Sequence, residues 1–234
     1  MSTFILGLDL GQTNDYSALI VAEQIMPEPA EPPADRRPRY DVRHIERFPL
    51  GTPYPTIVDA TVETFERPEL GDNVSLIIDG TGVGRAPVDM FRDRIGKRAH
   101  PVTITSGDAV SESEDGYIRT PKRDLVGVVQ VLLQSKRLRF AQGLQLVSLL
   151  TKELTNFHVK IDLETAHDSY GAWRAGQHDD LVLALALAVW AGENPVYFRP
   201  KGLFVMPTIV TARIPSRIER RDWLGRDRGY GGGT

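Results

Sequence analysis

Aspartates stand at the ends of two apolar segments and at the start of a third, and these residues are the ones best suited to chemistry. Asp9 ends the first segment, Asp79 ends the second, and Asp179 and Asp180 precede the third. The chain has no cysteine and five histidines, so its metal-binding chemistry should use oxygen ligands and hard cations. Gathered carboxylates repel one another unless cations lie between them. The leading hypothesis is therefore magnesium-assisted cleavage of a phosphodiester bond.

Each aspartate also has a purely structural interpretation. Asp9 and Asp79 both precede glycine-containing turns and could cap them. Asp180 could be the N-cap of a helix, with Asp179 favoured by the helix dipole. Two adjacent aspartates exceed what one cap needs, and the conjunction of all three positions favours a functional site.

The glycine run Gly80–Gly84 follows a predicted strand and opens a predicted helix, as phosphate-binding loops do. No lysine followed by serine or threonine stands at Walker spacing after it, and the dinucleotide pattern fails at its third glycine. The run is better explained as a tight turn that lets Asp79 project into a cleft.

Candidate nucleic-acid contacts are Lys122, Arg123 and His178. Lys122 and Arg123 begin a predicted helix, at the end where the helix dipole disfavours cations, which indicates either phosphate contact or solvation. His178 could position a water or a phosphate, or it could be an ordinary loop histidine. Asp15, at the start of the second predicted strand, could lie near the same site.

With 234 residues the chain can form one large domain, or one domain with an appendage. No apolar run approaches the roughly 20 residues of a membrane span, and no signal peptide is expected. The absence of cysteine excludes disulfides and thiolate chemistry and fits a cytosolic protein.

Charge divides the chain at Pro195. The whole chain carries −3 and the segment from Pro195 onward carries +5, so residues 1–194 carry −8. We therefore expect a domain over 1–194 and a basic, partly disordered extension over 195–234. The extension could meet a polyanion, or it could be simply a solvated end.

The elements that must position the aspartates follow an α/β order. Predicted strands are Phe4–Asp9, Ala18–Ile25, Tyr40–Phe48, Val74–Asp79, Val102–Ile104, Leu138–Phe140 and Phe157–Asp162. Predicted helices are Thr56–Glu66, Arg85–Arg94, a helix after Thr120, Leu144–Asn156 and Leu181–Ala191. In open α/β sheets, sites collect at the C-terminal ends of strands. The last helix is apolar all round and must pack against the sheet, which brings its N-terminus close to Asp9 and Asp79.

Two predicted helices show an inward apolar stripe at helical spacing. The stripe of the first is Ile57, Val58, Val62 and Phe65, and that of the helix after Thr120 is Leu125, Val128, Val129, Leu132 and Leu133.

Together these residues resemble the nuclease domain of the large terminase subunit of tailed bacteriophages, from about Phe4 to Ala191. The matching segments are Gly7–Asp9, Asp15–Ala18, Ile77–Gly84, Lys122–Val126, Glu153–Phe157 and His178–Ala188. The resemblance implies a ribonuclease H-like α/β fold, whose central mixed sheet has three antiparallel strands, then parallel strands, and is flanked by helices.

The activity implied by the resemblance is a two-metal endonuclease, using Mg²⁺ or Mn²⁺, that cuts concatemeric viral DNA during packaging. Asp9, Asp79, Asp179 and Asp180 would be the metal ligands, with Asp9 bridging the two ions. Partners would be double-stranded DNA, the portal protein and the small terminase subunit, in the cytoplasm of a phage-infected or lysogenic host. Large terminases also carry a packaging ATPase, and no Walker-type segment is present, so we expect an excised domain or a free-standing relative.

Three alternatives remain open. A Holliday-junction resolvase of the same fold also places carboxylates around two metals, but it would need a dimer. The segment Gly7–Asn14 looks like the first phosphate segment of actin-like sugar kinases and heat-shock ATPases, which need two such lobes. A catalytically inactive DNA-binding module would keep the basic tail without needing all the aspartates.

Overall fold

The computed structural model describes residues 2–12, 15–27, 37–164 and 179–198, with the backbone alone over 157–164. These residues belong to one compact unit, Met1–Arg199. The predictions for His178 and for the tail beyond residue 198 therefore lie outside the described residues. Within the described part, no helix is both long and apolar enough to cross a membrane.

Eight strands form one sheet. They are β1 Thr3–Asp9, β2 Ala18–Ile25, β3 Arg39–Arg47, β4 Val74–Asp79, β5 Ala99–Thr105, β6 Ser111–Glu112, β7 Ile118–Pro121 and β8 Leu138–Phe140. The helices are α1 Tyr54–Phe65, α2 Arg85–Ile95, α3 Lys122–Gln134, α4 Val147–Glu164 and α5 Asp180–Glu193, with short 3-10 turns η1 Pro68–Leu70, η2 Gly96–Arg98 and η4 Pro195–Tyr197.

The sheet has the order β6-β7-β5-β4-β1-β2-β3-β8. The first three strands pair antiparallel, and β4 and β5 add in parallel on the other side of β1. This arrangement confirms the predicted ribonuclease H-like sheet of three antiparallel strands followed by parallel ones. β8 extends the sheet in parallel beyond β3. β6 and β7, at the opposite edge, were not predicted from the sequence.

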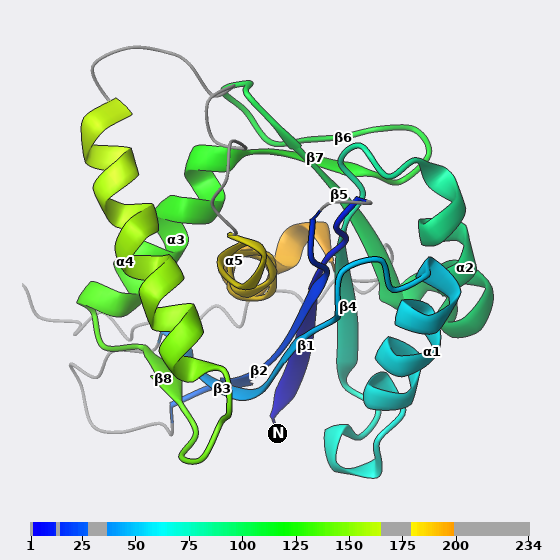
Figure 1. Ribbon diagram of the computed structural model, residues 1–234, viewed down its shortest axis with the longest axis horizontal. Coiled ribbons are helices and arrows are strands. Elements are labelled where there is room, and N and C mark those ends of the chain that lie inside the picture. The colour runs from blue at the N-terminus through cyan, green and yellow to red at the C-terminus, as the bar shows by residue number, and fades with distance from the viewer. Residues whose placement is uncertain (1, 13–14, 28–36, 165–178, 199–234) are drawn as a thin grey trace, which may run out of the picture. The chain divides into compact units, whose positions relative to one another are not determined.

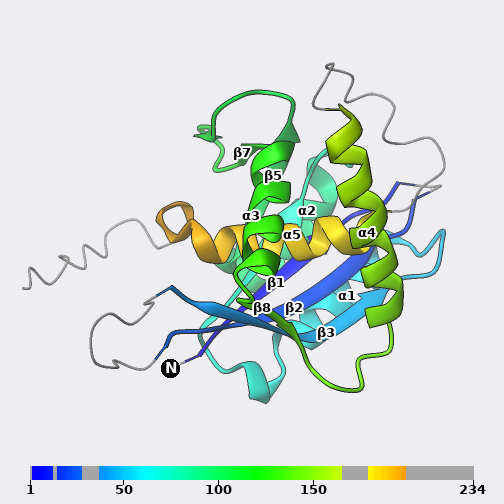
Figure 2. The same ribbon diagram turned by 90° about the vertical axis from the view of Figure 1, so that its left-hand side faces the viewer.

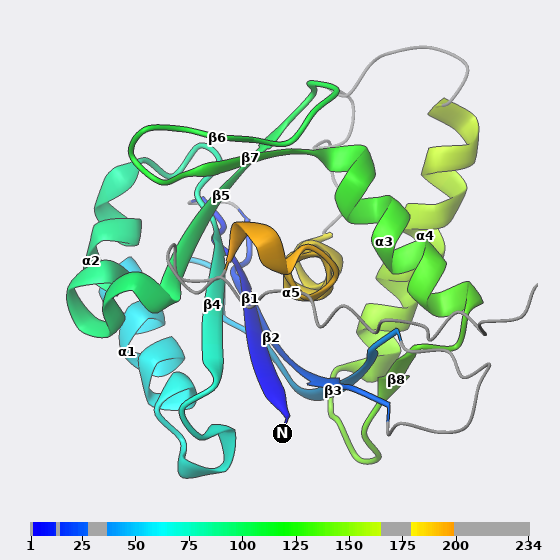
Figure 3. The ribbon, with the colours of Figure 1, turned by 180° about the vertical axis from the view of Figure 1, so that it is seen from behind.

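Helices cover both faces of the sheet. In Figure 1, α1 and α2 lie on one face, and α3, α4 and α5 lie on the other. Figure 2 shows α5 crossing β1 and β2 with α3 and α4 outside it, and Figure 3 shows the same layers from behind. Successive side chains of β1 point to opposite faces of the sheet, as in any strand. Ile5 belongs to the core beneath α5, whereas Leu6 and Leu8 belong to the core beneath α1 and α2.

The helix α5 is the innermost element on its face. Every residue from Asp180 to Gly192 is buried, which confirms the prediction of an apolar helix packed inside. The helix crosses β1 at Gly7, where an added Cβ would lie 2.0 Å from the carbonyl oxygen of Ala184 and 2.9 Å from the amide nitrogen of Ala188. Only a residue without a side chain allows so close an approach of the two backbones.

Two local predictions were wrong. The segment Phe157–Asp162 is not a strand but the last part of α4. Its apolar residues Phe157 and Ile161 are four apart, a spacing that also suits a helix, and continuing a helix already formed costs less than starting a new element. On α3, the predicted inward residue Leu133 is 40% exposed, whereas Leu125, Val129 and Leu132 are buried.

The contact at Gly7 gives a first prediction. Gly7→Ala should destabilise the fold by ~3 kcal/mol, at the upper end of overpacking effects, because backbone atoms cannot move aside as a side chain can. The matched control is Gly127→Ala on α3, where an added Cβ meets nothing within 4 Å. This change should stabilise the fold by about 0.5–1 kcal/mol through helix propensity. Urea unfolding of both variants measures the effects, and equal effects would contradict the close contact.

Candidate active site

One row of residues runs across the sheet at the end of β1. The register pairs Asp9 with Asp79 on β4 and with Ala18 on β2, and then Ala18 with Arg47 on β3 and Asp79 with Val102 on β5. Neighbouring strands in a sheet lie about 4.8 Å apart, so the two aspartates are adjacent. The parallel register therefore brings together two carboxylates that lie 70 residues apart in the sequence.

The row faces α5. Ala18 and Val102, its two apolar members, belong to the core on the α5 side of the sheet. Residues paired across a sheet share a face, so Asp9 and Asp79 point toward α5 as well. Both are buried, with 7% of each residue exposed.

Asp179 and Asp180 meet this row from above, at the N-terminus of α5. Asp180 is the first helical residue and is 5% exposed, whereas Asp179 occupies the N-cap position and is half-buried. The Asp179 side chain makes no capping hydrogen bond. A purely structural role as a side-chain cap therefore does not account for this pair.

Turns at the strand ends hold the aspartates in place. Gln12 Nε2 donates a 2.8 Å hydrogen bond to the carbonyl of Gly82 and so ties the turn after β1 to the turn after β4. The Thr81 amide donates to Asp79 Oδ1 at 2.7 Å, and Thr81 Oγ1 accepts from the Ile104 amide at 2.8 Å. Gly82 has φ of +78°, a left-handed conformation that glycine adopts readily. The glycine run thus acts as the predicted tight turn.

Electrostatics shows that the four carboxylates act on one another. Burial raises the pKa of Asp9 well above its usual value, and the charges of Asp79, Asp180 and Asp179 raise it further. Lys122 acts in the opposite direction, lowering the pKa of Asp9. The structure therefore brings together all four aspartates that the sequence singled out.

The two predicted basic contacts have different surroundings. Lys122 Nζ lies 3.6 Å from Asp179 Oδ2, and only 19% of its side chain is exposed. Burial lowers the pKa of Lys122, while Asp179 and Asp9 act to raise it. Arg123 lies on the surface, where it forms a 2.7 Å ion pair with Asp108. Lys122 is thus part of the carboxylate site, whereas Arg123 is not.

Two further residues of the site were not identified from the sequence. Arg47 donates a 2.7 Å hydrogen bond from Nη2 to Asp180 Oδ2, and its guanidinium lies 3.8 Å from the centre of the Tyr16 ring. Glu153, on α4, accepts a 3.2 Å hydrogen bond from the Leu181 amide. Burial raises the pKa of Glu153 to about 7, with the Arg47 charge acting against the shift.

A β-bulge explains why Arg47 was missed. The register of β3 against β2 shifts at Arg43, which has no partner of its own: Val42 pairs with Ala22 and His44 pairs with Val21. Strict alternation would put Arg47 on the face opposite Val42. The extra residue moves it to the same face, beside the carboxylates. Glu153 begins one of the segments that carry the resemblance to terminase nucleases, but as a carboxylate within an amphipathic helix it was given no role of its own.

The donors suit a divalent cation by type, although they are not yet arranged around one. Within the described ranges, no three acidic or imidazole side chains converge closely enough to hold a metal ion. Arg47 and Lys122 engage Asp180 and Asp179 instead. The set nevertheless consists of buried carboxylate oxygens that repel one another at Asp9, and a hard divalent cation relieves this repulsion.

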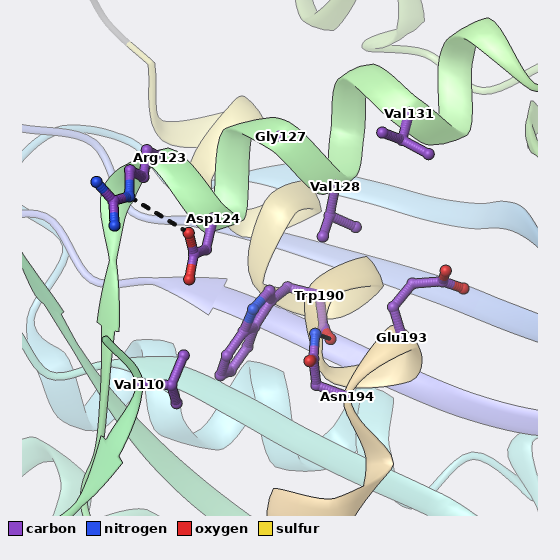
Figure 4. Close-up of a pocket in the computed structure, with 9 residues that line it drawn as sticks. All are labelled: Val110, Arg123, Asp124, Gly127, Val128, Val131, Trp190, Glu193 and Asn194. Atoms are coloured by element: carbon purple, nitrogen blue, oxygen red, sulfur yellow. Dashed lines mark hydrogen bonds and ion pairs between the residues drawn. The ribbon is translucent and has the colours of Figure 1, made fainter. Parts of the chain in front are cut away.

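A cavity of about 370 Å³ lies elsewhere, at the C-terminal end of α5 (Figure 4). Its lining includes Val128 and Val131 of α3, and Trp190 and Glu193 of α5. None of the four aspartates of the site lines it. A 14-residue helix is about 20 Å long, so the cavity and Asp180 lie at opposite ends of α5.

Comparisons with solved structures find terminase nucleases. The large terminase nuclease of thermophilic phage G20c is 16% identical, with a TM-score of 0.46 over 80% of this chain and 81% of that one. The human cytomegalovirus terminase nuclease domain, soaked with Mn, is 12% identical, with a TM-score of 0.49 over 84% and 87%. No protein-family model and no curated protein matches the sequence.

The raised pKa of Asp9 leads to a prediction about stability. The folded chain holds the Asp9 proton at pH values where the unfolded chain, with a pKa near 3.8, has lost it. This stabilising contribution is complete below pH 3.8 and is lost as the pH rises through the folded pKa. Asparagine has no such proton, so in EDTA Asp9→Asn should melt at a higher temperature than the wild type, and the difference should grow with pH.

Thermal melts at several pH values measure this difference. The matched control is Asp59→Asn on α1, an exposed aspartate paired with Arg94 at the surface, which should change the melting temperature little. Mg²⁺ or Mn²⁺ should then raise the melting temperature of the wild type and leave that of Asp9→Asn almost unchanged. If the difference in melting temperature between Asp9→Asn and the wild type stayed constant with pH, the pKa of Asp9 would not be raised, and repulsion by the other carboxylates would be excluded.

Proposed function

We propose that this chain is a metal-dependent endonuclease that hydrolyses phosphodiester bonds in double-stranded DNA. The observation that carries the proposal is the buried pair Asp9 and Asp79, adjacent in the sheet and facing Asp180 at the start of α5. Burying several carboxylates without neutralising them is costly, so a fold that keeps them together needs a compensating ligand.

The residues that would hold divalent cations are Asp9, Asp79 and Asp180, with Asp179 at the more exposed rim. Asp9 lies beside Asp79 in the sheet and feels the charges of both Asp180 and Asp179, so it is the best candidate to be shared between two ions. When bound, Mg²⁺ or Mn²⁺ would supply an activated water and stabilise the leaving oxygen of the phosphodiester.

The other residues of the site would orient these ligands. The Thr81 amide holds one oxygen of Asp79 by a hydrogen bond and so fixes the orientation of this carboxylate. Lys122 offsets part of the negative charge from its place beside Asp179, and it is a candidate contact for a phosphate of the DNA. Gly80, directly after β4, adds no side chain of its own at the end of the strand.

The sequence resemblance to terminase nucleases suggests the substrate in the cell. It points to concatemeric viral DNA cut during packaging, with an ATPase motor, the portal protein and the small terminase subunit as partners. Arg123 and His178 remain candidate DNA contacts under this proposal. An enzyme of this kind should hold DNA mainly through phosphates and show little sequence preference.

The central test is cleavage of supercoiled plasmid. The wild type should nick and linearise DNA with Mg²⁺ or Mn²⁺, without ATP, and EDTA should abolish the activity. Asp9→Asn should lower the rate by at least ~100-fold, since an amide is a poor ligand for two cations. The matched control is Asp59→Asn, which makes the same chemical change at an exposed residue of α1. It should retain full activity because Asp59 is not part of the carboxylate site. Cleavage that survives EDTA or needs ATP would overturn the proposal, and preferential cutting of four-way junctions would favour a resolvase.

Asp179 and Asp180 can be separated by the same assay. Successive residues on a helix diverge by about 100 degrees, so the two side chains cannot face one ion equally. Asp180 is the more buried and raises the pKa of Asp9 more strongly, so Asp180→Asn should reduce cleavage more than Asp179→Asn. Plasmid cleavage at saturating Mn²⁺ compares the two. An equal and complete loss would instead assign one residue of the pair to each ion.

A further inference from the structure

Arg47 lies between two buried carboxylates that belong to different helices. Its Nη2 lies 2.7 Å from Asp180 Oδ2 on α5, and its Nη1 lies 3.5 Å from Glu153 Oε1 on α4. Only 12% of the Arg47 side chain is exposed, and the two carboxylates are buried more deeply still. The first contact is a short hydrogen bond, whereas the second is a loose ion pair.

The arrangement leaves hydrogen-bonding capacity unused on both sides of the loose pair. Among the residues that the structure describes, the buried atoms Arg47 Nε and Glu153 Oε1 have no hydrogen-bond partner. A guanidinium carries five N–H donors, and buried polar groups are normally satisfied. Glu153 therefore presents an unused acceptor directly beside a guanidinium that is engaged elsewhere.

The Tyr16 ring supports the Arg47 guanidinium on one face, and the guanidinium can still shift along the ring between the two carboxylates. The Tyr16 ring lies 3.8 Å from it and supports its position by a cation–π contact. Arg47 itself is held in the cross-strand row through its pairing with Ala18. A movement that keeps the guanidinium against the ring can exchange the Asp180 oxygen for the Glu153 oxygen, because the distances to the two differ by less than ~1 Å.

We propose that Arg47 is a positioning residue that occupies Asp180 while no divalent cation is bound and transfers to Glu153 when a cation takes Asp180. This inference rests on the proposed function, because only a cation site gives Asp180 a second ligand. Glu153 is then the acceptor that allows Asp180 to be released.

The physical reason is the cost of a poorly paired buried charge. A cation that took Asp180 would leave the Arg47 guanidinium with only its loose 3.5 Å ion pair to Glu153, which opposes cation binding. Movement toward Glu153 would tighten that ion pair into a hydrogen bond and satisfy the Oε1 atom. Arg47 has a second carboxylate, that of Glu153, within reach on a different helix.

The test is a double-mutant cycle read by Mn²⁺ binding in calorimetry, with the melting temperature in EDTA as a second measurement. Arg47→Gln removes the competitor and should tighten Mn²⁺ binding by on the order of tenfold, while lowering the melting temperature in EDTA. Glu153→Gln removes the acceptor and should weaken Mn²⁺ binding by a similar factor. Removing a positive or a negative charge near the site would by itself change the Mn²⁺ affinity in these same directions. The decisive variant is therefore the double variant with both Arg47→Gln and Glu153→Gln.

If the exchange occurs, Glu153→Gln should have little effect on Mn²⁺ affinity once Arg47 is glutamine, because no guanidinium needs the acceptor. The matched control is Lys122→Gln, which removes another cation of the site, the one beside Asp179. In that background Glu153→Gln should keep its full effect. If Arg47→Gln does not fold, Arg47→Lys replaces it, since an ammonium keeps the charge but cannot reproduce the planar guanidinium geometry.

Two failures are distinguishable. An equal effect of Glu153→Gln with and without Arg47 would overturn the exchange and leave the proposed function intact. The proposed function, and this inference with it, would be overturned if the wild type bound no Mn²⁺. The same would follow if the Asp180→Asn variant bound Mn²⁺ with the affinity of the wild type.

Discussion

The contact between the backbone of α5 and the backbone of β1 at Gly7 determines the geometry of the whole α5 face. Because no side chain separates the two, the helix lies as close to the sheet as main-chain atoms allow. This fixes the height of Asp180 above the row that contains Asp9 and Asp79. The remaining helices on this face, α3 and α4, then pack around α5 and supply Lys122 and Glu153. A wider separation at Gly7 would move one carboxylate away from the others.

The same closeness creates an electrostatic problem that the protein meets with two cations of its own. Burial and mutual repulsion raise the pKa of Asp9, while Arg47 and Lys122 each neutralise one carboxylate at the start of α5. Lys122 also lowers the pKa of Asp9, but burial and the charges of the other three aspartates act more strongly in the opposite direction. The negative charges of the site are therefore only partly balanced by the protein itself, at some cost in stability, and the proposed divalent cation would offset that cost.

Much of this site could be predicted from sequence, because apolar segments ending in Asp9 and Asp79 predict buried parallel strands with their carboxylates at one edge. The apolar composition of the segment after Asp180 likewise predicted its burial against the sheet. Arg47 and Glu153 could not be predicted, since their roles depend on a register shift in β3 and on how α4 packs across α5. The extension of α4 through Phe157–Asp162 was missed because a short apolar pattern fits a helix and a strand equally well.

The register shift in β3 also limits which insertions and deletions this strand can accept. The extra residue, Arg43, pairs with Glu23 at the surface and has no role of its own among the carboxylates. Deleting one residue between Val42 and Ile45 would nevertheless turn Arg47 to the opposite face, toward the core beneath α1 and α2. Surface loops tolerate insertions and deletions, but β3 should not. Its length is constrained because the charge of Arg47, four residues after the bulged residue Arg43, must stay on the face of the carboxylates.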